Sequence, residues 1–258
     1  MVESLVKSVR VLGSDVQLVD LACIRRTLDA WVRSEDGVCR QMIVTGFHGL
    51  YRAHWDPVYR RIARGADLWV PDGIAPVALA RLKGMRGVVR TPGQDIVRTF
   101  LRLAEEKGYS SYFYGDREEV LQKMRLKVER EYPRHRVAGT YSPPFRPLTE
   151  EEDREIVERI NAARPDIVWV GLGMPKQDIW AYEHKGRLNA KAVIGVGAVF
   201  GFLAGTVRRC PDWIGNRGLE WLYRLCMEPR KLWRRDLIEG PCFLWHVMLE
   251  QLGIRKYE

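Results

Sequence analysis

The stretch GADLWVPDGIAPVALARLKGMRGVVRTPGQD, residues 65–95, carries the clearest signal in the chain. Within it a short apolar run, residues 68–70, ends at Pro71 and places a single acid, Asp72, directly before Gly73. A carboxylate on a Pro/Gly-bounded turn at the end of a strand is typical of the ligand-binding edge of open α/β folds. The alternative interpretation is that Asp72 is the N-cap of the helix that follows it.

Apolar strands and amphipathic helices alternate along most of the chain. The pattern predicts strands at residues 41–45, 66–70, 110–114, 136–140, 166–171 and 191–195. It predicts helices at residues 49–63, 74–82, 93–107, 118–131, 149–163 and 175–185. Because the strands are apolar and alternate with helices, we expect an α/β fold, a mostly parallel sheet with helices on both faces.

The composition is that of a globular protein with an excess of positive charge. Apolar residues make up 46% of the 258 residues, and the net charge of +9 favours an anionic partner such as a nucleotide, a nucleic acid or an acidic membrane. Five cysteines without a C-x-x-C pair indicate free thiols in a reducing compartment. The N-terminus lacks the apolar core of a signal peptide, and no apolar run approaches the ~20 residues that cross a bilayer. We therefore expect a cytoplasmic protein that can still lie on a membrane.

Four predicted strands end in polar residues or glycines, which a parallel sheet brings to one edge. These ends carry Thr45, Asp72, Gly171-Leu172-Gly173 and Gly195-Val196-Gly197. In the run GLGMPKQ the glycines permit close backbone approach, and Lys176 and Gln177 follow beside a helix start, where amide groups attract phosphate. Tight turning of the backbone is the alternative explanation of these glycines.

The run GVGAVFG, residues 195–201, superficially matches a dinucleotide-binding fingerprint. An NAD(P)-dependent oxidoreductase is therefore the alternative function, although the acid expected about 20 residues later, Glu220, falls in a predicted helix instead of ending a strand. The five histidines form no H-x-H or HExxH pattern, and the chain has no D-x-D motif. We therefore expect neither a zinc site nor a metal held by paired aspartates.

Near residue 206 the alternation stops and a helical, basic, tryptophan-rich tail begins. We expect a catalytic domain at residues 1–206 and an appendage at residues 207–258. Between residues 208 and 235, three acids are outnumbered by eight bases: Arg208, Arg209, Arg217, Arg224, Arg230, Lys231, Arg234 and Arg235. Four of the nine tryptophans also lie in the tail, at 213, 221, 233 and 245. Such a segment can clamp a diphosphate or lie in a membrane interface; a helix with its charged face in water is the bland alternative.

The order of the motifs resembles a known family. VTGFHG, GADLWVPDGIAPV, VVRTPGQD, YFYGD, VGLGMPKQDIW, IGVGAVFGFLAGT and GLEWLYRLCMEPRKLWRRDL, over about residues 10–245, are similar to the WecG/TagA/CpsF glycosyltransferases, glycosyltransferase family 26. The resemblance implies a Rossmann-like fold and a C-terminal appendage that completes the active site at the inner membrane face. It also implies an inverting transfer, without metal or other cofactor, from a UDP-sugar to a polyprenyl-diphosphate-linked sugar in polysaccharide or teichoic acid synthesis.

Carried over by position, the resemblance makes Asp72 the general base, with Arg90 and Thr45 as catalytic pocket residues. Together with the glycine runs it gives a candidate UDP-binding group of Gly171, Gly173, Lys176, Gln177, Gly195, Gly197, Arg224, Arg230 and Arg234. The family usually has T-x-N at the first strand end, whereas this chain has Thr45-Gly46-Phe47. We therefore expect Phe47 to stack on a sugar face and His48 to replace the missing polar group.

These residues predict a division of labour in the reaction. Asp72 takes a proton from the acceptor hydroxyl, and Arg90 with the tail arginines stabilises the leaving UDP. The expected partners are the UDP-sugar, the lipid-linked acceptor and an anionic membrane surface, with no nucleic acid; a homo-oligomer is compatible with the sequence. A non-enzymatic basic module that binds nucleic acid or membrane is the remaining alternative, and the chain carries no nucleic-acid-binding motif in its favour.

Overall fold

The computed structural model describes residues 7–208, 210–215 and 217–257. Residues 1–6, Arg209, Asn216 and Glu258 lie outside the description, and so do the side chains of Asp212 and Lys231. The extreme ends of the two predicted domains and two of the eight tail bases therefore fall outside the described part.

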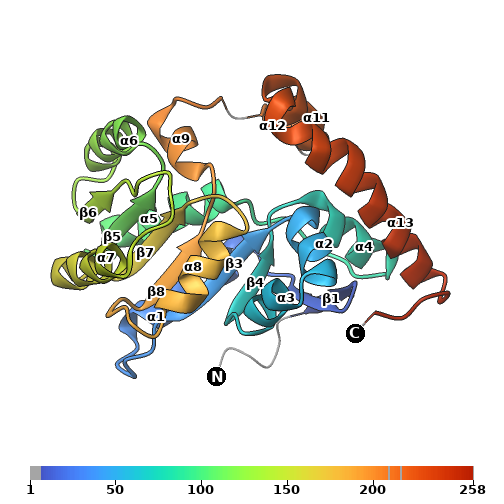
Figure 1. Cartoon of the computed structure of the whole chain (residues 1–258), viewed down its shortest axis with the longest axis horizontal. Helices are drawn as coiled ribbons and strands as arrows, with labels where there is room; N and C mark the ends of the chain where they lie inside the picture. Colours follow the sequence, from blue (N-terminus) through green and yellow to red (C-terminus); the bar gives the residue numbers. More distant parts are fainter. Residues whose placement is uncertain (1–6, 209, 216, 258) are drawn as a thin grey trace.

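A six-stranded parallel sheet forms the centre of the molecule, in the order β4-β3-β8-β7-β5-β6 (Figure 1). Its strands are β3 (Arg40–Thr45), β4 (Leu68–Pro71), β5 (Ser110–Gly115), β6 (Arg136–Tyr141), β7 (Ile167–Gly171) and β8 (Ala192–Gly195). The register pairs Thr45 with Pro71, Ile43 with Gly195, and Val170 with Gly195. The carboxyl ends of β3, β4, β7 and β8 therefore meet at one edge of the sheet, as the sequence predicts.

Helices cover both faces of this sheet (Figure 1). One core cluster holds α1 (Leu21–Arg33), α5 (Gly93–Lys107), α6 (Glu118–Glu131) and α9 (Val199–Ala204) against the strands. Two further clusters hold α2 (Phe47–Trp55), α3 (Pro57–Arg64), α4 (Ile74–Leu82), α7 (Glu150–Ala163) and α8 (Lys176–His184). Successive residues of β3 alternate between the two sides, because Met42 and Val44 join the first cluster and Ile43 another. The predicted α/β fold with helices on both faces is confirmed.

The single helix predicted at residues 49–63 is in fact two helices. α2 ends at Trp55 and α3 begins at Pro57. Asp56, between them, accepts hydrogen bonds from the backbone amides of Val58 and Tyr59 at 3.0 and 3.2 Å. A proline lacks the N–H needed to continue a helix but fits the first position of a new one, and the acidic N-cap before it fixes the break.

The segment before β3 holds structure that the sequence pattern does not assign. β1 (Ser8–Val11) and β2 (Ser14–Gln17) form an antiparallel hairpin whose turn residues, Leu12 and Gly13, have positive φ. The Gln17 side chain accepts a hydrogen bond from the Trp69 amide at 2.8 Å, which fixes the hairpin to β4. The hairpin thus extends the core beside β4 without joining the main sheet.

The C-terminal segment forms a string of helices across one side of the domain, coloured orange to red in Figure 1. Its elements are α10 (Asp212–Gly215), α11 (Glu220–Met227), α12 (Pro229–Arg234), the π-helical turn η2 (Arg235–Glu239) and α13 (Gly240–Gln251). Phe243 and Val247 of α13 are buried in the core cluster of α2 and α3. The Leu12 amide donates to the Glu250 carboxylate at 3.1 Å, which ties α13 to the hairpin. The predicted appendage therefore shares a core with residues of the predicted catalytic domain.

Candidate active site

Asp72 lies where three segments of the chain meet at the carboxyl edge of the sheet. Its backbone N–H donates to the Thr45 carbonyl at 3.1 Å, and the Thr91 amide donates to the Pro71 carbonyl at 2.8 Å. A Cβ atom added to Gly73 would lie 3.2 Å from the Cα atom of Gly46. Glycines at both positions therefore allow the loops after β3 and β4 to approach closely, which sets the position of Asp72.

The Asp72 carboxylate caps a helix, but not the helix that follows it. Its Oδ1 accepts a hydrogen bond at 3.0 Å from the amide of Gly93, the first residue of α5. The N-cap of α4 is Gly73, which makes no side-chain cap. The interpretation of Asp72 as the N-cap of the next helix is therefore wrong. The contact with α5 instead fixes the orientation of the carboxylate at the edge of the sheet.

The surroundings of Asp72 raise the pKa of its carboxyl group. Burial is the largest cause, and the nearby Glu220 acts in the same direction. The Gly93 amide and the guanidinium groups of Arg224 and Arg90 lower the pKa, without reversing the shift. A carboxylate whose pKa is raised is a stronger base once it is ionised, so this environment suits proton abstraction.

Arg90 joins the edge of the sheet to the C-terminal segment. Its Nη1 donates to Oε2 of Glu220, the first residue of α11, at 2.5 Å. The side chains are 18% and 31% exposed, respectively, so the ion pair is partly buried. A Cβ atom at Gly215 would lie 2.8 Å from Nη2 of Arg90, so the backbone at the end of α10 lies directly against the guanidinium. Sequence reasoning places Arg90 in the site but misses Glu220 as its partner, since 130 residues separate them.

Thr45 is buried beneath the first turn of α2. Its hydroxyl donates to the sulfur of Met174 at 3.4 Å. A Cβ atom at Gly49 would lie 2.4 Å from Cγ2 of Thr45, so only glycine at position 49 leaves room for this side chain. The structure gives Thr45 a packing role, and its expected part in catalysis rests on the resemblance alone.

Phe47 and His48, which we expect at a sugar, contact the C-terminal segment. The Phe47 ring lies 5.6 Å from the Phe243 ring of α13, centroid to centroid. His48 Nε2 lies 2.9 Å from Oε2 of Glu239 in η2, and burial lowers the pKa of the imidazole. In the structure both side chains fix the tail to α2, a role that the sequence pattern does not predict because the tail is about 190 residues further along the chain.

Side chains of the protein fill the space at most glycines of the two runs. A Cβ atom at Gly171 would lie 2.6 Å from the Phe200 ring, and one at Gly195 would lie 2.7 Å from Oδ1 of Asp178. These contacts favour the explanation that the two glycines serve tight packing. Gly173 differs, because it has a φ of +76° and nothing lies within 4 Å of its Cβ position.

Gln177 links the two glycine runs from inside the protein. Its side-chain Oε1 accepts a hydrogen bond from the Gly197 backbone amide at 2.7 Å, and its backbone N–H donates to the Gly173 carbonyl at 3.0 Å. The Gly197 amide is therefore engaged within the protein, which disfavours the use of residues 195–201 as a dinucleotide phosphate site. Lys176, the preceding residue, is exposed.

Of the three tail arginines expected at the diphosphate, only Arg224 lies close enough to Asp72 to influence its pKa. Arg224 follows Glu220 by one helical turn and lies 3.9 Å from Glu228. Arg230 and Arg234 are exposed on α12. The structure thus brings together Asp72, Arg90, Glu220 and Arg224, and leaves Arg230 and Arg234 on the surface.

Comparison with known proteins matches this arrangement to a family of enzymes. The profile of the "Glycosyl transferase WecG/TagA/CpsF family" matches residues 9–257. This chain belongs to that family. An N-acetylglucosaminyldiphosphoundecaprenol N-acetyl-beta-D-mannosaminyltransferase of Bacillus spizizenii is 32% identical over 187 residues, which are 72% of this chain and 70% of the relative. Proteins of the same name are 32% identical in Bacillus subtilis, over 78% of this chain and 76% of the relative, and 25% identical in Staphylococcus aureus, over 77% and 75%.

Family membership confirms the resemblance that the motifs indicate, and makes the chain a glycosyltransferase. None of the described helices of this glycosyltransferase is both long and apolar enough to cross a bilayer. Among the described residues, no group of three or more His, Cys, Asp or Glu side chains is arranged to hold a metal ion.

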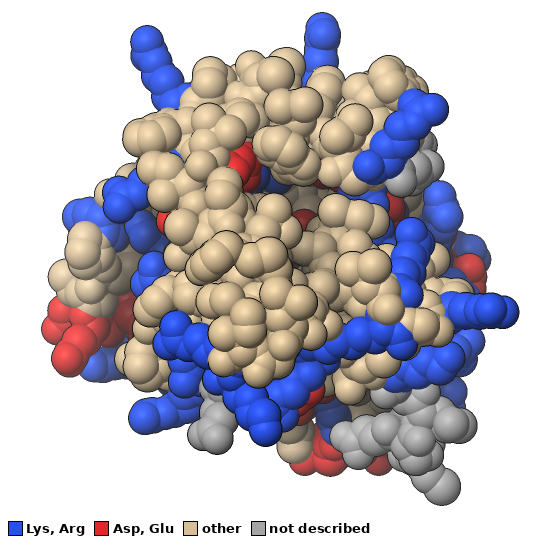
Figure 2. Space-filling view, turned by 90° about the vertical axis from the view of Figure 1, so that its right-hand side faces the viewer, with Lys and Arg blue, Asp and Glu red and all other residues tan. Residues whose placement is uncertain are grey.

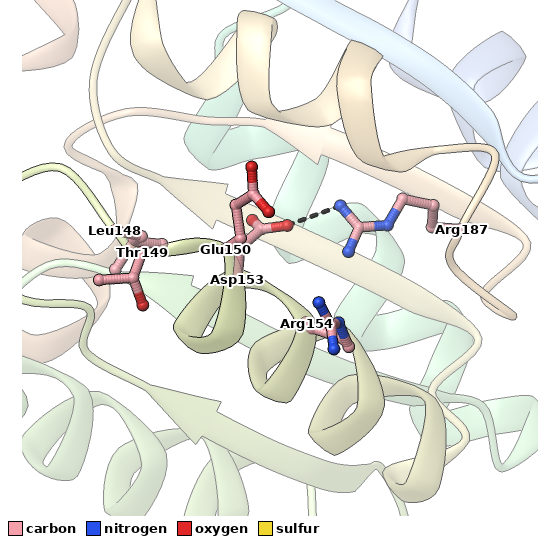
Figure 3. Close-up of a pocket in the computed structure, with 6 residues that line it drawn as sticks. All are labelled: Leu148, Thr149, Glu150, Asp153, Arg154 and Arg187. Atoms are coloured by element: carbon pink, nitrogen blue, oxygen red, sulfur yellow. Dashed lines mark hydrogen bonds and ion pairs between the residues drawn. The ribbon is translucent and has the colours of Figure 1, made fainter.

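A surface pocket of about 440 Å³ lies beside α7 (Figure 3), and α7 lies at the other end of the sheet from β4 (Figure 1). Its lining residues are Leu148, Thr149, Glu150, Asp153, Arg154 and Arg187. Asp153 accepts a hydrogen bond from Arg187 at 2.6 Å and lies 2.6 Å from His184 Nε2. Because these groups pair with one another, and Asp72 and Arg90 lie at the other end of the sheet, this pocket is not the candidate active site of the glycosyltransferase.

Proposed function

We propose that this chain transfers an N-acetylhexosamine, with N-acetylmannosamine as the first candidate, from a UDP-sugar to polyprenyl-diphosphate-linked N-acetylglucosamine. The names of its relatives describe this acceptor and this transferred sugar. The observation that carries the proposal is the position of Asp72 at the carboxyl edge of the sheet, fixed by the Gly93 amide and accompanied by Arg90 and Arg224. A base beside two guanidinium groups suits transfer from a nucleotide diphosphate, because the base can take the acceptor proton and the guanidinium groups can stabilise the leaving diphosphate.

In the proposed reaction, Asp72 accepts the proton of the acceptor hydroxyl as that oxygen attacks the anomeric carbon of the donor. The new bond joins the acceptor oxygen to the sugar, and the bond between the sugar and the diphosphate breaks. UDP leaves with the electron pair of the broken bond. Attack from the side opposite UDP inverts the anomeric centre. A positioned base of this kind typically accelerates a reaction ~10²–10⁴-fold.

Arginine supplies the positive charge that the leaving diphosphate needs. Arg90 is held at the sheet edge because the amide of the next residue, Thr91, donates to the Pro71 carbonyl at the end of β4, and Arg224 reaches the same region from α11. Guanidinium groups bind diphosphate oxygens in pairs through parallel N–H donors, so they can stabilise the charge that develops on UDP. We propose that these side chains take the part that a divalent metal plays in other glycosyltransferases.

The C-terminal segment offers a surface suited to the membrane that carries such an acceptor. Trp213, Trp233 and Trp245 are 63%, 50% and 57% exposed. Figure 2 shows this side of the molecule: uncharged residues cover its centre, Lys and Arg stand around them, and acidic residues are visible in a hollow. Tryptophans with surrounding bases are typical of segments that lie in the interface of an anionic membrane. We therefore propose that the enzyme works as a peripheral protein on the inner face of the cell membrane.

The test is acceptor-dependent release of UDP. The wild-type chain and Asp72→Asn are incubated with UDP-N-acetylmannosamine, other UDP-sugars and a polyprenyl-diphosphate N-acetylglucosamine analogue, with EDTA present. We expect release by the wild type and a ~10²–10⁴-fold lower rate for Asp72→Asn, since the amide cannot take the proton. Asp15→Asn, an exposed acid of the hairpin that lies 4.0 Å from Arg10, is the matched control and should keep full activity.

Two results would contradict the proposal. Equal rates for the wild type and Asp72→Asn would remove Asp72 from the chemistry. If no donor gives UDP release and UDP does not raise the melting temperature, the proposed UDP-sugar donor is wrong. The family and the fold would still stand.

A further inference from the structure

In this structure the carboxylate of Glu220 is bound to the guanidinium of Arg90, the group that the proposed reaction assigns to the diphosphate. Arg90 donates to Glu220 at 2.5 Å, and the pair is partly buried. Carboxylates and phosphates are recognised by the same fork of guanidinium N–H groups. Glu220 therefore presents to Arg90 the same kind of oxygen acceptor that a diphosphate would present.

The fold holds Glu220 in this position through the turn before α11. Gly218 has a φ of +77°, and its Cβ position lies 3.3 Å from the side chain of Ile74, at the start of α4. The backbone of Gly215 lies against the guanidinium of Arg90. Gly215 and Gly218 thus lie against the two segments that carry Arg90 and Asp72, and the Arg90–Glu220 ion pair is a polar contact between α11 and the sheet edge.

We propose that Glu220 is a positioning residue that holds the place of the donor diphosphate on Arg90 and is displaced when the donor binds. The inference rests on the proposed function, because it requires that Arg90 bind the diphosphate. A diphosphate carries more negative charge than a carboxylate and competes for the same N–H donors. Displacement frees the turn at residues 217–220, so this turn moves away from Asp72 when the donor binds and returns once UDP has left.

The same arrangement links Glu220 to the base. Four groups act on the pKa of the Asp72 carboxyl: the Gly93 amide of α5, Arg90 before α5, and Glu220 and Arg224 of α11. Glu220 raises the pKa of Asp72, whereas the other three lower it. Removal of the Glu220 charge should therefore lower the pKa of Asp72 in the free enzyme. The acid limb of the kcat/KM profile, which reports the free enzyme, should move to lower pH.

The experiment compares UDP binding by calorimetry for the wild type, Glu220→Gln and Glu129→Gln. Glu129 pairs with Arg125 on the exposed face of α6 at 2.8 Å, so its substitution removes the same charge and a similar contact far from Asp72. We expect Glu220→Gln to bind UDP about threefold to tenfold more tightly than the wild type, since UDP no longer competes with an ion pair. Glu129→Gln should match the wild type.

Melting temperatures show whether the variants are folded, and Glu220→Asp provides a second test. Aspartate keeps the charge but shortens the reach to Arg90, so a smaller gain in UDP affinity is expected. If Glu220 has only a structural role, the opposite is expected. Glu220→Gln and Glu220→Asp would both bind UDP more weakly than the wild type, and the acid limb of the kcat/KM profile would not move. UDP binding by the wild type with equal or weaker binding by Glu220→Gln would overturn the inference and leave the proposed donor intact. If neither the wild type nor Glu220→Gln binds UDP, the proposed donor fails, and the inference fails with it.

Discussion

At the scale of single residues, Asp72 serves the fold and the proposed chemistry with one carboxylate. Its Oδ1 accepts the Gly93 amide at the start of α5, which satisfies a helix donor that has no partner within the helix. Asparagine retains an oxygen at this position, so Asp72→Asn keeps the cap and removes the base. Alanine would remove both, and a loss of activity in that variant would not separate chemistry from folding. This is the physical reason for choosing asparagine in the activity test.

The packing of Thr45 against Gly49 leads to a second residue-scale prediction. Gly49→Ala places a methyl group 2.4 Å from Thr45 Cγ2, and Thr45 Cβ is only 2.9 Å away, so the backbone has to shift. Overpacking of this kind costs about 1–3 kcal/mol, partly offset by about 1 kcal/mol of better helix propensity. We expect net destabilisation in urea unfolding, and a smaller loss from Gly49→Ala in a Thr45→Ala background, where the contacts with Cγ2 and Oγ1 are gone and the 2.9 Å contact with Cβ remains.

The matched control for this double-mutant cycle is Gly186→Ala, where nothing lies within 4 Å of the new methyl group. The change in the free energy of unfolding caused by Gly186→Ala should be the same in the wild-type and Thr45→Ala backgrounds, because the two sites share no contact. If the changes in free energy of unfolding caused by Gly49→Ala and Thr45→Ala simply add, the Thr45 side chain does not contact the Cβ position of residue 49 as the structure indicates.

At the scale of elements, the sequence predicts best where local signals agree. The helices at 74–82, 93–107 and 118–131 have the predicted bounds, and a glycine in the left-handed conformation, Gly108, ends the second of them. The capping box that predicts the start of α7 is present, since Thr149 and Glu152 exchange hydrogen bonds with each other's backbone. These signals lie within a few residues of the structure that they determine, so they can be interpreted without tertiary information.

The elements that sequence reasoning misses depend on distant contacts. The hairpin at residues 8–17 is short and is held by Trp69 and Glu250. The partner of Arg90 belongs to α11, and Phe47 packs against α13. Motif order places Asp72 and Arg90 in the site and implies that the tail completes it, but no local pattern indicates that Glu220 pairs with Arg90.

The contact between α2 and α13 gives a prediction on pH. His54 packs 4.9 Å from His246 and 4.8 Å from Tyr257, and burial lowers the pKa of His54 to about 4, with His246, Arg60 and Arg255 acting in the same direction. The ordinary pKa of histidine is ~6.5, so the folded protein loses stability as the pH falls from there toward 4, by up to about 1.4 kcal/mol per pH unit. His54→Phe should reduce this loss.

Thermal melts from pH 7.5 to pH 4.5 measure the effect. His54 Nε2 is buried without a hydrogen-bond partner among the described residues, so phenylalanine at this position leaves no donor or acceptor unmatched there. Part of the pH dependence should persist in the variant, because burial also lowers the pKa of His135 to about 4. Identical pH dependence for the two proteins would mean that His54 does not set the acid stability of the α2–α13 contact.

At the scale of the whole molecule, charge and exposed apolar surface are distributed unevenly. The tail carries the exposed side chains of Leu237, Leu244, Trp245, Met248 and Leu252, while its inner residues Phe243 and Val247 belong to the core. The net charge of +9 predicts an anionic partner but not where it binds. The structure adds that exposed tryptophans belong to the same C-terminal segment whose Glu220 pairs with Arg90, so a membrane against that segment would bring a lipid-linked acceptor close to the base.

Vesicle binding distinguishes this arrangement from a charge effect spread over the whole surface. Arg230→Ala/Arg234→Ala removes two exposed bases from α12, and Lys123→Ala/Arg130→Ala removes two exposed bases from α6. Each basic residue near an anionic bilayer contributes about 1 kcal/mol, so the α12 double variant should bind anionic vesicles about 30-fold more weakly. The α6 double variant has the same net charge and should bind like the wild type, because α6 lies at the opposite end of the molecule from α13 (Figure 1). Equal losses in both variants would show that binding follows net charge alone and that the tail has no privileged contact with the membrane.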